Sequence, residues 1–360
     1  MTTPALLRLR EKFPGAHITL LTPDKLKDLW LHHPAVDEII SFAPGESVFS
    51  IGKKLRAGKF DLALVLPNSP RSAIEVFLAG IPRRIGHARP LRNFFLTQTV
   101  LPRAGAVKMR KRTTAEIHQL IAVDDSQRPD SNSRVLPNAA TDAHQIHEYL
   151  HLAVALGANA ELLAPQLFVT ADEIEAAKKK FSLDKISNPI FGLNPGAEYG
   201  PAKRWPVERF IAAAKEVQQR TDCVWLLFGG KNESAADILS AEESFRQNVG
   251  STFFNLSGKT SLRELMSLLK LCRVVLTNDT GPMHVAAALG TPVVVPFGST
   301  SPELTGPGLP GDARHRLLKS DASCAPCFLR ECPIDFRCMN GIGVERVVRA
   351  FLEAVATGRR

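Results

Sequence analysis

One stretch, residues 274–299 (VVLTNDTGPMHVAAALGTPVVVPFGS), limits the folds open to this chain more than any other part of the sequence. It begins as an apolar, β-rich run and turns at Asn278-Asp279-Thr280-Gly281. A helical pattern follows from Pro282 to Gly290, and a second apolar run comes directly after it. Strand, turn, helix and strand in this order form the βαβ unit of a parallel sheet. The stretch therefore predicts an α/β protein.

The turn of this unit is a candidate binding site. It places Asp279, Thr280 and Gly281 at the start of a helix, where free N–H groups and the positive end of the helix dipole favour a phosphate. His284, one turn into the helix, would face the same place. A simpler interpretation is that Asp279 or Thr280 only caps the helix.

Two more predicted strands of the second half end in residues suited to close contact with a ligand. One ends in Asn194-Pro195-Gly196 and the other in Gly229-Gly230. Open α/β sheets bind ligands at the carboxyl ends of their strands, so these loops should share one edge with the Gly281 turn. Lys203, on a nearby loop, would offer a point charge to a phosphate. We therefore predict a nucleotide-diphosphate site without a metal ion, formed by Asn194, Gly196, Lys203, Gly229, Asp279, Thr280, Gly281 and His284.

Strands alternate with helices in both halves of the chain, which predicts two α/β domains. We place the first at residues 1–168 and the second at 186–342, with a closing helical segment at 343–360. The first half opens on a helix beginning near Thr3 rather than on a strand. Because the first strand of a doubly wound domain is usually central, we expect a hole in this sheet.

The charge of the chain favours anionic partners. The formal net charge is +9, and part of the excess lies in loop-like sequence of the first half. Arginine pairs well with phosphate and carboxylate groups, so we predict that Arg71, Arg84 and Arg92 bind an acidic acceptor substrate. The alternative is a solvated positive face. With two Tyr and three Trp in the chain and no recognition-helix pattern, we expect no nucleic-acid partner.

Three motifs together resemble one known family. They are N-P-G-A-x-Y-G-x-x-K-R-W-P from Asn194, N-D-T-G-x-M-H-V-A-A-A-L-G-T-P from Asn278, and the cysteine-rich C-A-P-C-F-L-R-E-C-P from Cys324. L-P-N-S-x-x-S-A and A-G-I-P-x-R-I-G in the first half add to the likeness. The chain resembles glycosyltransferase family 9, the lipopolysaccharide heptosyltransferases, and most of all the ADP-heptose–LPS heptosyltransferase II type.

The resemblance implies a GT-B fold, in which two Rossmann-like domains face each other across a cleft, and an inverting, metal-independent transfer with no cofactor. The implied donor is ADP-heptose, and the implied acceptor is a heptose of the lipopolysaccharide inner core. By position, Asp279, Thr280 and Gly281 would hold the diphosphate, Lys203 would neutralise the leaving diphosphate, and His284 would support the same loop. The family also implies a cytoplasmic protein, peripheral at the inner face of the inner membrane, and a closing helix that packs back on the first domain.

The sequence departs from the family pattern at its start. The family's general base resembles an Asp in a G-D loop just before the helix that holds T-x-P-A-L. Here that helix begins at Thr2-Thr3-Pro4, and Met1 stands where the loop should end. One hypothesis is a start codon assigned too far downstream. Another is a non-catalytic remnant that binds a nucleotide sugar, and a third is a different GT-B sugar transferase or an epimerase.

Four cysteines near the end, Cys324, Cys327, Cys332 and Cys338, have the spacing C-x2-C-x4-C-x5-C. Zinc is one interpretation, although the last two spacings are compact for a structural site. Because the same pattern occurs in the resembled enzymes, we interpret it as a structural loop near the donor site. The sequence shows no export signal, so we expect reduced thiols.

Overall fold

The computed structural model describes residues 1–124, 135–136, 142–230 and 252–358. The chain forms two compact units, Met1–Ala106 with Asp142–Phe168, and Val107–Thr141 with Val169–Arg360. Residues 107–141 thus belong to the second unit, whereas the sequence boundary at 168 assigned them to the first. In the described part of the chain, no helix has both the length and the apolar character needed to cross a bilayer.

The second unit is built on one sheet in which seven strands are described, in the order β6-β12-β11-β10-β7-β8-β9. Every pairing among them is parallel except that of β6 with β12. The strands are β6 (Val135–Leu136), β7 (Ile190–Asn194), β8 (Val224–Leu227), β9 (Phe253–Asn255), β10 (Val274–Thr277), β11 (Val293–Phe297) and β12 (Arg316–Lys319). This confirms the predicted parallel α/β sheet.

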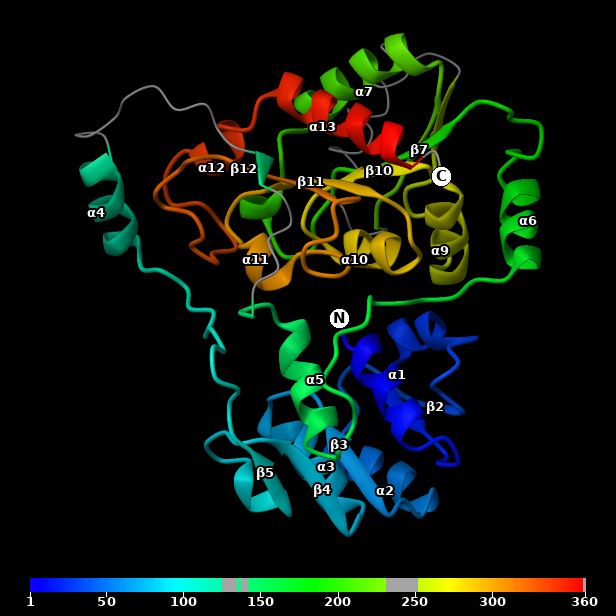
Figure 1. Ribbon diagram of the computed structural model, residues 1–360, viewed down its shortest axis with the longest axis vertical. Coiled ribbons are helices and arrows are strands. Elements are labelled where there is room, and N and C mark those ends of the chain that lie inside the picture. Colours follow the sequence, from blue (N-terminus) through cyan, green and yellow to red (C-terminus); the bar gives the residue numbers. More distant parts are fainter. Residues whose placement is uncertain (125–134, 137–141, 231–251, 359–360) are drawn as a thin grey trace. The chain divides into compact units, whose positions relative to one another are not determined.

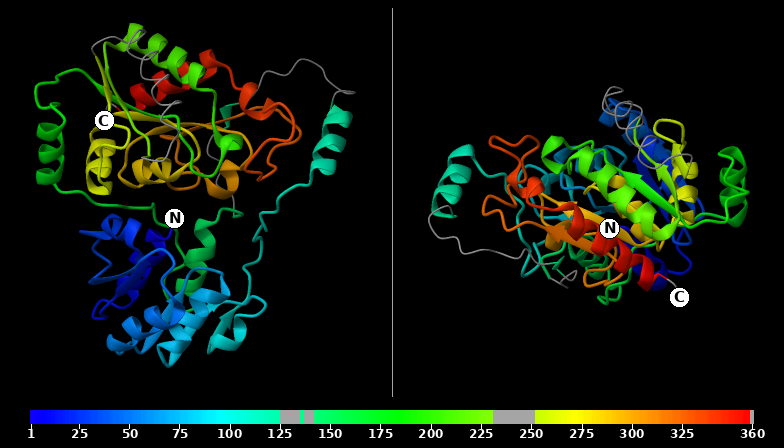
Figure 2. Two further views of the ribbon diagram at one scale, coloured as in Figure 1. Left: turned by 180° about the vertical axis from the view of Figure 1, so that it is seen from behind. Right: turned by 90° about the horizontal axis from the view of Figure 1, so that it is seen from above.

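Helices cover both faces of this sheet. α7 (Val207–Thr221) and α13 (Val344–Thr357) lie on one face, and α9 (Leu262–Leu271) and α10 (Gly281–Ala288) on the other (Figures 1 and 2). α6 (Ala171–Lys180) packs against α9. The other helical elements in the described part of the unit are α4 (Thr114–Asp124), η3 (Pro201–Lys203), α11 (Pro302–Thr305) and α12 (Arg337–Asn340).

The core of the second unit centres on three aromatic rings. Phe191 of β7 lies 5.4 Å from Trp225 of β8 and 5.0 Å from Phe351 of α13, measured between ring centroids. Each of these side chains is at most 1% exposed. α13 is therefore part of the core of the second unit, where it packs on α7 and on strands β10 to β12.

The first unit has a different sheet architecture. β1 (Thr19–Pro23) pairs only with β2 (Glu38–Phe42), and β3 (Leu62–Val65), β4 (Arg83–His87) and β5 (Gln98–Val100) form a separate parallel sheet. The helical elements are α1 (Thr3–Lys12), η1 (Asp24–Trp30), α2 (Val48–Ala57), α3 (Pro70–Leu78), η2 (Asn93–Phe95) and α5 (Ile146–Val154). The five strands of this unit are thus divided between two sheets.

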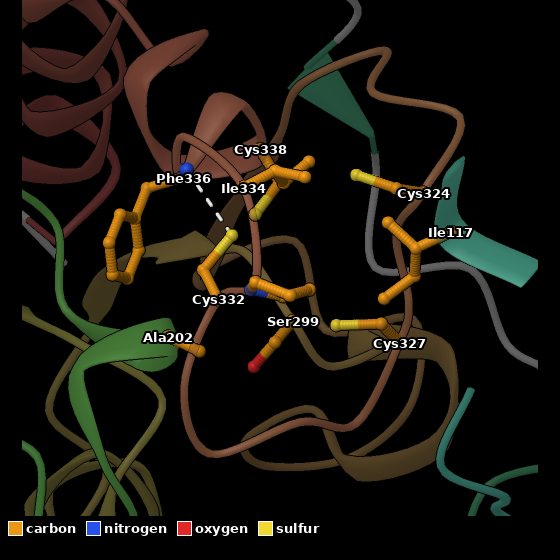
Figure 3. A pocket seen from close by; sticks show the side chains of 10 residues that line it. Ile117, Ala202, Ser299, Cys324, Cys327, Cys332, Ile334, Phe336 and Cys338 are labelled. Atoms are coloured by element: carbon orange, nitrogen blue, oxygen red, sulfur yellow. Dashed lines mark hydrogen bonds between the residues drawn. The ribbon is translucent and has the colours of Figure 1, made fainter. Parts of the chain in front are cut away.

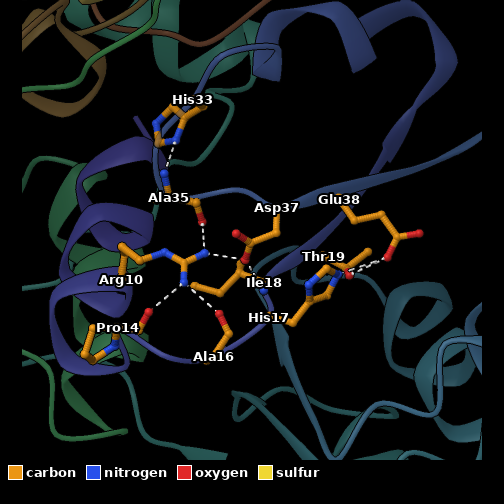
Figure 4. A network of polar contacts seen from close by, with 10 residues as sticks. All are labelled: Arg10, Pro14, Ala16, His17, Ile18, Thr19, His33, Ala35, Asp37 and Glu38. Carbon is orange, nitrogen blue, oxygen red and sulfur yellow. Dashed lines mark hydrogen bonds and ion pairs between the residues drawn. The ribbon is translucent and has the colours of Figure 1, made fainter.

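A polar network joins α1 to the β1–β2 pair (Figure 4). The guanidinium of Arg10 donates to the carbonyl of Ala16 at 2.6 Å and to the carboxylate of Asp37. The backbone N–H of Ile18 donates to the same carboxylate at 2.7 Å, and this bond, followed by that from Arg10, lowers the pKa of Asp37. The two-stranded sheet is therefore joined to its helix by hydrogen bonds at the solvent boundary.

Candidate functional site

The strand order of the second unit determines where a ligand can bind. From β7 the chain runs outward to β8 and then β9, and after β9 it crosses back to β10, on the other side of β7. β7 and β10 are thus the neighbours between which the sheet changes direction, and Asn194 pairs with Thr277 at their last residues. The crevice beyond the carboxyl ends of two such strands is the usual binding place in open α/β sheets.

A buried ion pair lies at this switch point. Lys203, on the loop after β7, places its Nζ 2.7 Å from Oδ2 of Asp279, which follows β10. The hydroxyl of Thr300 donates to the same carboxylate oxygen at 2.6 Å. The Asp279 side chain is 4% exposed and that of Lys203 is 15% exposed. Removing one member of a pair this deeply buried typically costs about 3–5 kcal/mol, because the other charge is left uncompensated.

The structure decides against a simple capping role for the turn. Thr280 is the N-cap residue of α10, but no hydrogen bond from its side chain caps the helix. The carboxylate of Asp279 is directed to Lys203 and Thr300 instead. The first N–H groups of any helix lack intrahelical partners. At α10, Pro282 has no N–H, and the N–H of Met283 donates to the carbonyl of Thr280 at 3.1 Å. Gly281 is exposed and would have open space around an added Cβ, so its backbone N–H is the candidate donor to an anion.

Two buried asparagines hold the ends of β7 and β10 together. Asn278 accepts from the backbone N–H of Trp205 at 3.0 Å and donates to the carbonyl of Pro195 at 2.5 Å. Asn194 donates to the hydroxyl of Thr277 at 3.0 Å. Asn194 is buried, with 4% of its surface exposed to solvent. Its amide joins the ends of the two strands, and its contact with a donor stays a prediction.

The other predicted donor-site residues lie on the same edge of the sheet. Gly196 is half-buried on the loop after β7, and His284 is half-buried in the first turn of α10. Gly229 directly follows Phe228 at the end of β8, and its carbonyl accepts from the N–H of Gly258 at 3.0 Å. The fold thus brings the carboxyl ends of β7, β8 and β10 together as expected, while the polar contacts centre on Lys203 and Asp279.

Thr300 was missed by the sequence analysis. It lies three residues beyond β11, which ends at Phe297, and so belongs to a fourth strand end on the same edge. The same rule that selected the other three loops applies to the run Gly298-Ser299-Thr300-Ser301. The position of this run after a predicted strand was visible in the sequence. Nothing in the sequence separates the hydroxyl of Thr300 from those of its serine neighbours.

The four cysteines of the closing loop surround one small cavity (Figure 3). All four are free thiols; Cys332 is half-buried and the other three are buried. Burial raises the pKa of Cys338 to about 12, so this thiol stays protonated and packs as a small apolar group. Among the residues that the structure describes, no group of three or more His, Cys, Asp or Glu side chains could hold a metal ion. Ala202, beside Lys203, lines the same cavity.

The three predicted acceptor arginines have different surroundings in the first unit. Arg71, in the first turn of α3, is about half-exposed and binds Glu75 at 2.9 Å. Arg84, at the amino end of β4, donates to the carbonyl of Phe95 at 2.8 Å. Arg92 is fully buried, and its contact with Asn68 measures 3.3 Å. Of the three, only Arg71 presents a large exposed surface at the carboxyl end of a strand.

The arrangement at the switch point can bind an anion and stabilise negative charge. The N-terminus of α10 begins at Gly281, and Lys203 is held by the carboxylate of Asp279, two residues before it. Donors fixed before a reaction lower its barrier when charge develops on the group they contact. A leaving diphosphate is such a group.

Comparison with a protein family places this geometry in a known context. A model described as glycosyltransferase family 9 (heptosyltransferase) matches residues 113–336. That range includes the ends of β7, β8, β10 and β11 and most of the cysteine loop.

Comparison with single proteins extends the likeness to most of the chain. The lipopolysaccharide heptosyltransferase 2 of Escherichia coli (strain K12) is 32% identical over 339 residues, covering 90% of this chain and 88% of that protein. The solved structure of E. coli ADP-heptose LPS heptosyltransferase II matches with a TM-score of 0.76 and 26% identity, covering 100% of this chain and 95% of that one. E. coli heptosyltransferase WaaC with ADP shares the fold, with a TM-score of 0.62 at 16% identity and coverage of 99% and 93%.

Proposed function

This chain belongs to glycosyltransferase family 9, the heptosyltransferases, and from that premise we propose that it moves a heptose from ADP-heptose to a heptose of the lipopolysaccharide inner core, with inversion and without a metal ion. As a member of that family it is a glycosyltransferase, similar to lipopolysaccharide heptosyltransferase 2. We further propose that the two units are the paired domains of the GT-B fold, which the full-length likeness to heptosyltransferase II supports.

The observation that carries the proposal is the Lys203–Asp279 pair at the switch point of the second unit. When the bond between heptose and diphosphate breaks, negative charge increases on the leaving ADP. The Gly281 turn would donate backbone N–H groups to a phosphate, and Lys203 would supply a positive charge beside it. Asp279 and Thr300 fix the position of the lysine, so little rearrangement is needed at the moment of reaction.

For the acceptor, we propose that Arg71 of the first unit contacts an anionic group of the inner core. Its guanidinium is about half-exposed in the first turn of α3, where the helix N-terminus adds a favourable potential for an anion. Arg84 and Arg92 would act indirectly, because their side chains contact Phe95 and Asn68 within the unit.

We also propose a membrane surface as a partner, at the cytoplasmic face of the inner membrane. In the first unit, Leu91 is 83% exposed and Phe94 is 82% exposed, and the exposed Arg83 and Arg89 lie nearby in the sequence. Exposed apolar side chains together with cations suit an anionic lipid surface. The double variant Leu91→Ser/Phe94→Ser should sediment less with vesicles that contain anionic phospholipid. Unchanged sedimentation, or equal sedimentation of the wild type with neutral vesicles, would count against this surface.

The test of the function is ADP release from ADP-heptose in the presence of a heptose-bearing, core-truncated lipopolysaccharide and EDTA. We expect ADP release, and a decrease in kcat/KM of at least about 100-fold for Lys203→Met, the size seen when one fixed donor to a developing charge is removed. Lys185→Met changes an exposed lysine that precedes the amino end of β7 and serves as the control.

Three results would refute the proposal or parts of it. ADP release that requires an added divalent cation contradicts the metal-independent reaction. ADP-heptose binding without transfer indicates a nucleotide-sugar-binding protein instead of a transferase. Transfer to another acceptor class, with none to heptose, contradicts the assigned substrate.

A further inference from the structure

Two loops of the second unit are joined by their backbones. The lysine loop (residues 195–206) carries Lys203, and the cysteine loop (residues 323–338) carries the four thiols. The N–H of Ala202 donates to the carbonyl of Arg330 at 3.0 Å, and the N–H of Phe328 donates to the carbonyl of Ser299 at 2.7 Å. The cysteine loop therefore contacts both the lysine loop and the segment that contains Thr300.

Gly200 shows how closely the two loops approach. Its φ is +149°, and a Cβ added to it would lie 2.4 Å from the carbonyl oxygen of Arg330. Backbone at that distance cannot move aside as a flexible side chain can, so only glycine fits here. The position of Arg330 relative to Lys203 is thus determined by backbone packing.

Tyr199 lies between the two loops and contacts both of their cations. Its hydroxyl donates to the carbonyl of Phe328 at 2.8 Å, and its own carbonyl accepts from Nε of Arg330 at 2.6 Å. Nζ of Lys203 lies 4.8 Å from the centre of the Tyr199 ring, and Cζ of Arg330 lies 5.5 Å from it. These are cation–π distances, so one ring orients a lysine and an arginine together.

The positive charge at the switch point is smaller than the negative charge of a diphosphate, and Arg330 can supply the difference. Lys203 is paired with Asp279, so the pair as a whole has no net charge. The helix N-terminus adds only about half a positive charge, whereas the diphosphate of a nucleotide sugar carries about two negative charges. Arg330 is exposed, and among the described residues no carboxylate forms an ion pair with it.

We propose that Arg330 is a second cation of the donor diphosphate site and that Tyr199 is the positioning residue that holds Arg330 and Lys203 toward it. This inference rests on the proposed function, because it assumes that the switch point binds a nucleotide diphosphate. It also gives the cysteine loop a role, which is to present Arg330 at the edge of the sheet where Lys203 and the Gly281 turn already lie. The ligand class is a nucleoside diphosphate or its sugar ester.

The experiment compares ADP with adenosine, which has no phosphate, in calorimetric titrations of the full chain. Arg330→Gln should weaken ADP binding about tenfold, in line with the loss of one charged hydrogen bond, and should leave adenosine binding unchanged. Arg330→Lys keeps the charge and should recover part of the loss. Equal weakening of both ligands, or unchanged ADP affinity in Arg330→Gln, would overturn the assignment.

Tyr199 is tested by two substitutions that separate its ring from its hydroxyl. Tyr199→Phe keeps the ring and should retain most of the ADP affinity. Tyr199→Leu removes the ring and should lower the ratio of ADP to adenosine affinity as far as Arg330→Gln does. If Tyr199→Leu lowers the thermal unfolding temperature but leaves that ratio unchanged, the residue is structural only.

The outcome also separates this inference from the proposed function. A wild-type chain that does not bind ADP refutes the donor site itself. A wild-type chain that binds ADP, with binding lost in Lys203→Met and kept in Arg330→Gln, refutes only the role of Arg330.

Discussion

Strands and helices alternate in both units of this chain, but the two units form different sheets. In the second unit, β7, β8, β10 and β11 are buried along their whole length within one sheet. In the first unit, β1 and β2 are mostly half-buried and belong to a two-stranded sheet of their own. The sequences of these second-unit strands are continuous apolar runs, as expected when helices cover both faces of a parallel sheet.

The difference extends to the polar side chains. In the second unit, Lys203 and Asp279 are buried together at the switch point, with Thr300 completing the contact. In the first unit, Arg84 and Arg92 turn inward to partners within the unit, and Arg71 stays about half-exposed. The buried ion pair of the second unit thus accompanies a continuous sheet, and the exposed arginine of the first unit accompanies a divided one.

The largest effect should come from removing the ring at the centre of the second core. Phe351→Ala deletes a fully buried side chain that contacts Phe191 and Trp225, and we expect a loss of about 3–5 kcal/mol in the free energy of unfolding of this unit. Urea unfolding in a Trp30→Phe background checks this, because the remaining tryptophans, Trp205 and Trp225, both lie in the second unit.

The matched control for this prediction is Phe95→Ala, in the first unit. It should leave the second-unit transition at its original urea concentration. If Phe95→Ala shifts that transition as far as Phe351→Ala does, the two cores are not independent and the comparison fails.

A second prediction compares the strands directly by hydrogen exchange. Amides of β1 and β2 should exchange at least about 100-fold faster than those of β7 and β10, because small sheets with exposed edges open locally at low free energy. Mass spectrometry of peptides that cover residues 19–42 and 190–194 would measure this. Equal protection in both regions would show that the division of the first sheet carries no cost in local stability.

The third prediction concerns pH and the buried His315 of the second unit. Burial lowers the pKa of His315 to about 4, and its Nδ1 accepts the N–H of Val293 at 3.3 Å. Between pH 6.5 and 4 the unfolded chain binds a proton that the folded unit excludes, so stability is full above pH 6.5 and falls as the pH drops. From pH 7 to pH 5 the loss should be about 2 kcal/mol.

His315→Gln tests this assignment, because glutamine can still accept the N–H of Val293 but does not titrate. Its urea transition should depend less on pH between 7 and 5 than that of the wild type. An unchanged pH dependence in the variant would assign the effect to other groups.

The smallest predicted effect tests the surface of the first unit. Arg71→Met should raise the KM for the lipopolysaccharide acceptor about tenfold, the size of one lost charged contact, and leave ADP affinity unchanged. Lys53→Met, which removes an exposed charge from α2, is the control. Equal effects of both variants would mean that only overall charge matters.

Much of the fold was predictable because its signals are local. The βαβ unit at residues 274–299 was placed within two residues of the observed β10, α10 and β11. Thr170 and Ser261 form complete capping boxes with Glu173 and Glu264, three residues further along each helix. These features depend on residues three or four positions apart, which the sequence displays directly.

The details of the site were harder to predict because they depend on distant residues. Lys203 and Asp279 are 76 positions apart, and their direct contact is set by the packing of two loops. The sequence indicated that both lie at one edge, but not that the carboxylate pairs with the lysine instead of capping α10. Likewise, the burial of Arg92 depends on the close approach of Gly86, which no spacing in the sequence shows.

The most direct test of the central claim is a crystal structure of the chain with ADP bound in the absence of divalent cations. We predict that phosphate oxygens lie within hydrogen-bonding distance of the Gly281 backbone N–H and of Nζ of Lys203, with the Lys203–Asp279 contact preserved. ADP bound at any other place in the second unit, or phosphates held through a metal ion, would contradict the account.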